Sequence, residues 1–149
     1  MIKISIVNMA KVIKQVHPDY IAIYRVGVFY NVYGKDSYIM SEYFGYMMKN
    51  TTENIPTCGF SKKSINKVKT RLEDKKVNYL IIEPRNNYDV EEKSDNGNLN
   101  TYKVELQKAY QSVNQRKEIQ KVKEKLELYL GTDKFKTIIR KVEDAIDEI

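Results

Sequence analysis

Phe29, Tyr30 and Asn31 are the residues of this chain with the clearest chemical potential. They follow Gly27 within a run in which aromatic and aliphatic residues alternate, residues 20–33. That alternation predicts two strands joined by a tight turn at the glycine. An aromatic ring at such a turn can insert between unstacked bases of a nucleic acid. The alternative is that Phe29 is a core aromatic at the start of a strand.

Four basic residues lie close to this run in the sequence or precede the next helical pattern. Arg25 and Lys35 bracket the aromatic group, and Lys62 and Lys63 stand at the start of a helical pattern. Cations are disfavoured at a helix N-terminus unless an anion lies between them, and the free amides there favour phosphate. We therefore expect Lys62 and Lys63 to help bind a phosphate group. The alternative is that both are surface lysines without a ligand.

The positive charge of the chain is concentrated in its first part. Residues 1–85 carry 14 Lys or Arg and 7 Asp or Glu, whereas residues 86–149 carry 12 and 13. Each phosphate that a basic side chain neutralises releases counterions, which strengthens binding at low salt. The distribution therefore favours DNA as the partner of the first part, although a solvated basic surface would have the same composition.

Hydrophobic spacing predicts the elements that position these residues. Helical periodicity covers residues 5–16, 36–47 and 61–75, and the apolar run at 77–82 predicts a strand covered on both faces. A polar stretch with the dipeptide Asn96-Gly97 follows. It predicts either a long hairpin, with residues 88–90 and 99–104 as its arms, or a tip without regular structure.

The last third of the chain is predicted to be helical. Gly131 predicts the end of one helix, and Thr132 or Asp133 is a candidate N-cap of the next. We therefore expect two parts, residues 1–102 and a helical extension over residues 103–149. The apolar stripes of the extension need a partner, which could be the sheet, a second copy or another protein. We favour the sheet, because two stripes out of phase fit two short packing surfaces better than one coiled coil.

The aromatic run resembles the start of the mismatch-recognition domain, domain I, of MutS-type DNA repair proteins. The resemblance rests on His17-Pro18, a hydrophobic strand, and then Tyr24-Arg25-Val26-Gly27-Val28-Phe29-Tyr30. The family has a glutamate at the position of Asn31. Further blocks follow in the family's order: Ile55-Pro56-Thr57-Cys58-Gly59-Phe60, a helix pattern over residues 64–72, and a strand ending at Glu83.

The resemblance implies an α+β fold, a mixed β-sheet of about five strands surrounded by helices, here followed by a C-terminal helical hairpin. It also implies that Phe29 enters the minor groove and stacks on a mispaired base. Asn31 keeps a donor and an acceptor but lacks the carboxylate of the family's glutamate. General DNA affinity should therefore rise and mismatch discrimination should fall. The predicted DNA-binding set is Phe29, Tyr30, Asn31, Arg25, Lys35, Lys62 and Lys63.

The sequence contains little that could support catalysis. It lacks the Gly-x-x-x-x-Gly-Lys-Ser/Thr loop of an ATPase, and His17 and Cys58 stand in no nucleophile or metal pattern. We expect a bacterial, cytoplasmic binding module with no cofactor, metal, ATP or membrane segment. It would bind distorted, mismatched or single-stranded DNA in a repair or mobile-element setting. The alternative is a non-catalytic protein-interaction adaptor that uses the domain as a scaffold and the helices over 103–149 as the contact surface.

Overall fold

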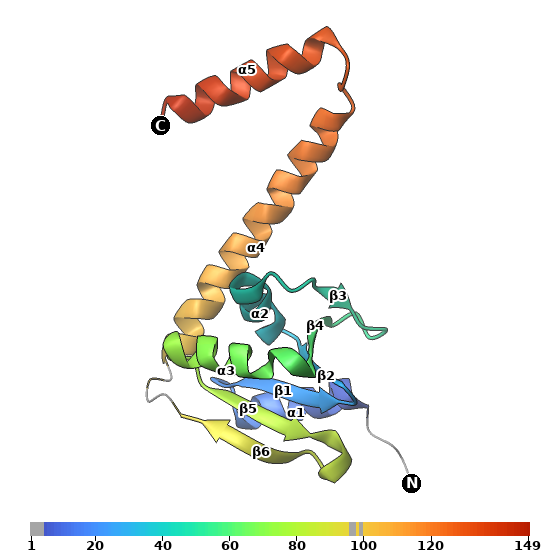
Figure 1. Cartoon of the computed structure of the whole chain (residues 1–149), viewed down its shortest axis with the longest axis vertical. Coiled ribbons are helices and arrows are strands. Elements are labelled where there is room, and N and C mark those ends of the chain that lie inside the picture. Colours follow the sequence, from blue (N-terminus) through green and yellow to red (C-terminus); the bar gives the residue numbers. More distant parts are fainter. Residues whose placement is uncertain (1–4, 96–97, 99) are drawn as a thin grey trace. The chain divides into compact units, whose positions relative to one another are not determined.

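The computed structural model describes residues 5–95, 98 and 100–149, which form two compact units that divide after Val113 (Figure 1). The first unit is a six-stranded mixed sheet with helices on both faces. The elements are α1 (Ile6–Val16), β1 (Ile21–Val26), β2 (Phe29–Tyr33), α2 (Asp36–Phe44), β3 (Lys49–Asn50), β4 (Pro56–Ser61), α3 (Ile65–Asp74), β5 (Tyr79–Glu83), β6 (Asp89–Ser94), α4 (Asn100–Glu127) and α5 (Asp133–Asp147). The predicted α+β class and mixed sheet are confirmed, with one strand more than expected among the described residues.

The sheet has the strand order β3-β4-β2-β1-β5-β6. β1 and β5 are parallel, and the other neighbours are antiparallel. β1 and β2 form the predicted hairpin, in which Val26 lies opposite Phe29. Gly27 has φ +62°, a conformation that favours glycine and lets the chain reverse within two residues. Phe29 is therefore the first residue of β2, directly after the turn.

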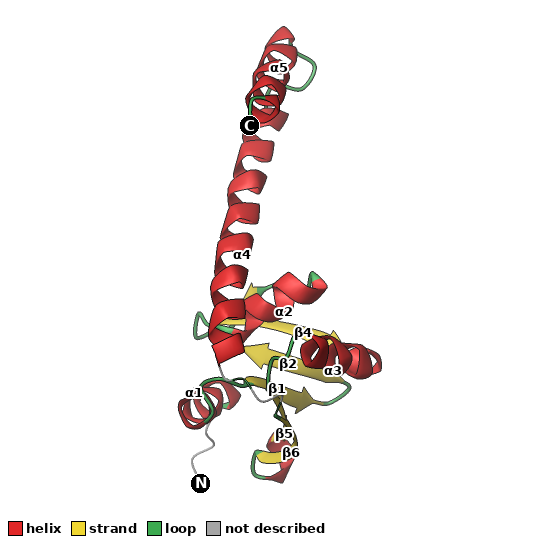
Figure 2. Cartoon of the chain, turned by 90° about the vertical axis from the view of Figure 1, so that its left-hand side faces the viewer, coloured by secondary structure: helices red, strands yellow, loops and turns green. Residues whose placement is uncertain are grey.

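Helices lie on both faces of the sheet (Figure 2), and a hydrophobic cluster fills the space on each face. The larger cluster packs the sheet against α2, α3 and the first turns of α4. The smaller cluster packs β1 and β5 against α1. Alternate residues of a strand point to opposite faces. Accordingly, Tyr30 and Val32 belong to the larger cluster, while Tyr33 packs against the smaller one, on the face that Phe29 and Asn31 share.

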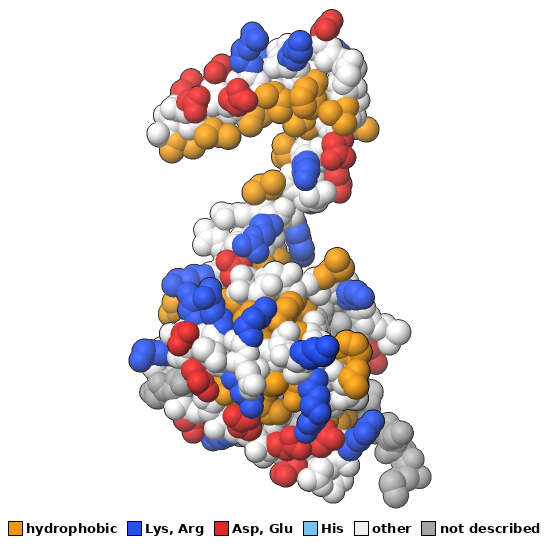
Figure 3. All heavy atoms as spheres, viewed as in Figure 1, with side chains coloured by type: hydrophobic (Ala, Val, Ile, Leu, Met, Phe, Trp, Pro, Cys, Tyr) orange, Lys and Arg blue, Asp and Glu red, His pale blue; other side chains and the backbone are white. Residues whose placement is uncertain are grey.

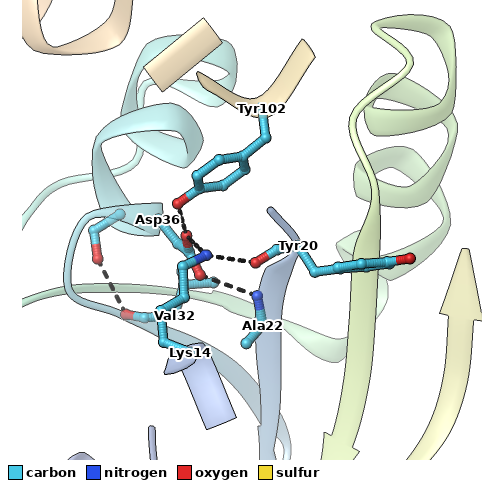
Figure 4. A network of polar contacts seen from close by, with 7 residues as sticks. Lys14, Tyr20, Ala22, Val32, Asp36 and Tyr102 are labelled. Atoms are coloured by element: carbon cyan, nitrogen blue, oxygen red, sulfur yellow. Dashed lines mark hydrogen bonds and ion pairs between the residues drawn. The ribbon is translucent and has the colours of Figure 1, made fainter. Parts of the chain in front are cut away.

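A buried carboxylate ties α1, β1, α2 and α4 together (Figure 4). Asp36, which is 1% exposed, accepts hydrogen bonds from the Ala22 N–H at 3.0 Å, from Lys14 Nζ at 2.6 Å and from the Tyr102 hydroxyl. Burial lowers the pKa of Lys14 below its ordinary value, while attraction to Asp36 opposes this change. The network therefore fixes the first turn of α4 to the sheet.

The segment after Pro84 folds differently from the prediction. β6 pairs with β5 through the short connection at residues 84–88, with a bulge between Ile81 and Ile82. The predicted second arm over residues 99–104 is wrong, because Asn100 begins α4 and its N–H donates to the Asn98 side chain at 3.0 Å. Asn96-Gly97, the predicted tip, lies outside the described residues.

The first unit continues beyond the boundary predicted after residue 102. Ala109 and Val113 of α4 are buried in it. The second unit, Asn114–Ile149, contains the rest of α4 and all of α5. Gly131, with φ +79°, lies in the turn between these helices, and Thr132 is the N-cap of α5, as predicted. In the part of the chain that the structure describes, no helix has the length and apolar character needed to span a membrane.

Candidate nucleic-acid interface

The side chain of Phe29 is uncovered at the turn end of β2, beside Ser61 at the end of β4. We call this end of the sheet, with Phe29, Asn31, Lys62 and Lys63, the corner. Phe29 is 54% exposed, and the preceding turn residue Val28 is 68% exposed. β4 follows β2 on this side, with Ser61 opposite Phe29. The smaller cluster, which packs on α1 on this face, reaches Tyr33 at the far end of β2 and does not include Phe29. The ring is therefore free to contact a ligand.

Tyr30, the next residue, belongs to the core. It is 5% exposed, and its ring stacks on that of Phe60 with the centroids 5.5 Å apart. Phe60 stacks in turn on Tyr46. A core ring cannot reach a base while the domain is folded. The prediction that Tyr30 contacts DNA therefore does not fit its position on the covered face of the sheet.

Asn31 lies on the same face as Phe29 and is held by its neighbours. Its Nδ2 donates one hydrogen bond to the Tyr33 hydroxyl at 3.2 Å, which leaves Oδ1 as an acceptor and the second N–H as a donor. On β4, Gly59 lies opposite Asn31. A Cβ atom at Gly59 would lie 2.5 Å from Asn31 Oδ1 and 3.2 Å from the Tyr30 carbonyl oxygen. Glycine at this position therefore provides the space that the amide group occupies.

A groove of about 410 Å³ opens beside these residues. It is lined by Phe29, Asn31, Met47, Lys49, Thr57, Cys58 and Gly59. Met47 is 76% exposed, and Lys49 pairs with Thr57 across β3 and β4. Sequence reasoning missed Met47, Lys49 and the role of Gly59. Only Gly59 carried a signal, because it stands in the Ile-Pro-Thr-Cys-Gly block.

Lys62 and Lys63 are exposed and lie next to the turn that carries Phe29. They belong to a 3-10 turn, Lys62–Ser64, that leads into α3. The Lys62 N–H donates to the Val28 carbonyl oxygen at 3.0 Å. This amide is therefore not free for the phosphate contact that was predicted, whereas the two ammonium groups are accessible.

Arg25 and Lys35 lie away from this corner. Arg25 pairs with Tyr30 across the hairpin, so it points to the face opposite Phe29, and it forms an ion pair with Glu91 at 3.4 Å. Lys35 follows the far end of β2, with its Nζ 5.9 Å from the centre of the Tyr102 ring. The structure thus brings Phe29, Asn31, Lys62 and Lys63 to one corner, adds Lys49, and leaves Arg25 and Lys35 outside it.

Cys58 lines the groove, but its side chain belongs to the larger core cluster on the opposite face, where the thiol donates to the Ser37 carbonyl oxygen at 3.9 Å. Burial raises the pKa of this thiol to about 12, so it is protonated at neutral pH and a poor nucleophile. Within the described residues, no three side chains of His, Cys, Asp or Glu converge to hold a metal ion. The chemistry that the groove offers is stacking, hydrogen bonding and positive charge.

Comparison with known families gives a direct match. The model of MutS domain I matches residues 6–125, most of the 149-residue chain, including the whole sheet and nearly all of α4. A comparison with curated proteins gives no match. Domain I of MutS is a non-catalytic DNA-binding domain. The chain therefore belongs to the MutS domain I family, the mismatch-recognition module of MutS proteins.

Proposed function

We propose that this chain binds distorted, mismatched or single-stranded DNA at the corner of the sheet around Phe29. The observation that carries the proposal is the 54% exposure of Phe29 at the hairpin turn, while Tyr30 next to it is buried. An exposed phenyl ring beside a groove and two lysines is suited to stacking on a base. Membership of the MutS domain I family supports the same use of this corner.

Insertion of the Phe29 ring would be selective for weakened base steps. Unstacking a base pair costs a few kcal/mol, and this cost is lower where the duplex is mismatched or easily kinked. Asn31 would act beside the ring with its Oδ1 as a hydrogen-bond acceptor and with one N–H of Nδ2 as a donor, because Tyr33 takes only the other N–H. It would offer a base N–H group an uncharged acceptor where the family has a carboxylate.

Three lysines around the corner would contact phosphates. They are Lys49 in the groove and Lys62 and Lys63 beside the turn. Three neutralised phosphates correspond to a log–log salt dependence with a slope of about −2 to −3. Such contacts hold the protein on the DNA without reading sequence.

We expect the chain to bind mismatched duplex and single strands more tightly than perfect duplex, with this salt dependence. The test is a fluorescence anisotropy titration of labelled homoduplex, mismatched duplex and single-stranded DNA at several salt concentrations. Replacing Lys49, Lys62 and Lys63 with glutamine should flatten the slope to near zero. The matched control replaces Lys117, Lys121 and Lys123, which are exposed on α4, and should keep it.

The absence of binding at low salt and micromolar protein would refute the proposal. Equal loss of affinity in the control variant would show that only the net charge matters and that the corner is not the site.

Asn31→Glu tests the position beside the ring of Phe29, which we propose to insert between bases as a wedge. The added charge should lower affinity for perfect duplex by about 0.5–1 kcal/mol, the size of an exposed charge contact. The carboxylate should at the same time raise the ratio of mismatch to homoduplex affinity, because it restores the family's residue. Asn114→Glu adds the same charge on an exposed part of α4 and should change neither value. If Asn31→Glu leaves both unchanged, position 31 does not face DNA.

A further inference from the structure

α5 carries a continuous apolar face of which Phe135, Ile138 and Ile139 are only half-buried and the remaining residues are exposed. No residue of α5 is buried, and Val142 and Ile146 are 42% and 61% exposed. Figure 3 shows hydrophobic atoms along one side of this helix and charged atoms along the other. The apolar face comprises Phe135, Ile138, Ile139, Val142, Ala145 and Ile146, and Ile149 just beyond the helix continues it. A continuous apolar face of this kind marks an interaction surface.

The charges of α5 are ordered along the helix. After Asp133, the basic residues Lys134, Lys136, Arg140 and Lys141 all precede Val142, and the acidic residues Glu143, Asp144, Asp147 and Glu148 all follow it. The same order is visible in Figure 3, with basic atoms towards the start of α5 and acidic atoms towards its end. This order opposes the helix dipole, which favours acidic residues at the start and basic residues at the end. The charges therefore destabilise an isolated α5, so their order calls for an explanation outside the helix.

We propose that α5 pairs with α5 of a second copy of this chain, antiparallel, about a twofold axis near Val142. Antiparallel pairing brings the basic half of each helix against the acidic half of the other and opposes the two helix dipoles. Parallel pairing would bring like charges together. The apolar face suits a twofold axis, because Ile138 and Ile146 stand four residues on either side of Val142, and Phe135 and Ile149 stand seven.

The charged residues that border the apolar face indicate which side chains of the two copies would face each other. Lys136, Glu143 and Asp147 follow one border, and Lys134, Lys141 and Glu148 recur every seven residues along the other. In an antiparallel twofold pair, each border meets its own counterpart. Lys136 then faces Asp147 of the second copy, and Lys134 faces Glu148 of the second copy. Lys141 and Glu143 stand one residue on either side of Val142, on opposite borders, and each faces its own counterpart near the axis. These are the two like-charge contacts of the arrangement.

The first test is the oligomeric state of the full chain. Sedimentation equilibrium over a range of concentrations should show a monomer–dimer equilibrium for the wild type. Val142→Glu places two charges at the axis and should leave a monomer with unchanged circular dichroism. Ile119→Glu is the matched control, because Ile119 is 66% exposed on α4 and outside the proposed contact. It should still dimerise.

The second test exchanges the charges. Lys134→Glu with Lys136→Glu should weaken dimerisation roughly ten-fold or more, since four attractive contacts per dimer become repulsive. Adding Asp147→Lys and Glu148→Lys should restore the dimer, because the exchanged charges are complementary again. A purely structural role of these residues would not produce this recovery.

A full chain that is monomeric at every concentration would overturn the proposal, and so would a dimer that survives Val142→Glu. If the monomeric chain is destabilised by Val142→Glu, α5 packs on its own domain, as first expected from the sequence. Failure of the fourfold charge exchange to restore the dimer would exclude the antiparallel arrangement. None of these measurements involves DNA, so their outcome is independent of the proposed function.

Discussion

Phe29→Ala is expected to weaken binding to mismatched or single-stranded DNA by about 1–3 kcal/mol, the range measured for stacking of one base on an aromatic side chain. Affinity for perfect duplex should change less, because that DNA resists insertion of the ring. Stability should hardly change, since the side chain is 54% exposed and makes no contribution to either core cluster. Anisotropy titrations and thermal unfolding of the same preparation measure both effects.

The neighbouring Tyr30 provides the matched comparison. Tyr30→Ala removes a core ring stacked on Phe60 and should lower the free energy of unfolding by about 3–5 kcal/mol, as is typical of large core truncations. Phe29→Leu keeps apolar bulk without an aromatic face and should recover only part of the lost affinity. If Phe29→Ala lowers stability as much as Tyr30→Ala does, Phe29 is a core residue and has no role as a wedge.

Asp36→Asn is expected to lower the free energy of unfolding by about 3–5 kcal/mol, because it leaves the ammonium group of the half-buried Lys14 without its counter-charge. The substitution also weakens the acceptor that joins the Ala22 N–H and the Tyr102 hydroxyl. Since the network links four elements, the loss should affect the whole first unit. Urea unfolding, followed by circular dichroism, measures the change in midpoint and slope.

Glu91→Gln is the matched control, since it makes the same change of carboxylate to amide in the exposed ion pair with Arg25. It should cost no more than about 1 kcal/mol. Lys14→Met combined with Asp36→Asn removes both charges and should recover part of the loss, because a buried ion pair can be replaced by apolar packing at little cost. If Asp36→Asn behaves like Glu91→Gln, the buried network does not stabilise the fold.

The sequence by itself determined the local features of this protein. Alternation of aromatic and aliphatic residues around Gly27 defined the β1–β2 hairpin and placed Phe29 directly after its turn. Helical spacing defined α1, α2, α3 and α5 to within a few residues of their observed ends. These features depend on neighbouring residues along the chain. The same is true of the motif blocks that resemble MutS domain I, which the family comparison confirmed.

The tertiary structure decided which of these residues lie together in the core and which lie together at the groove. Phe29 and Tyr30 are adjacent and chemically alike, and only the helices that cover one face of β2 make Tyr30 a core residue. Lys49 and Gly59 join the groove through the pairing of β4 with β2 and β3, whereas Arg25 is removed from it by strand alternation. Tyr102 reaches Asp36 across 66 residues of sequence. Such positions depend on strand pairing and helix cover between distant segments, which no local pattern encodes.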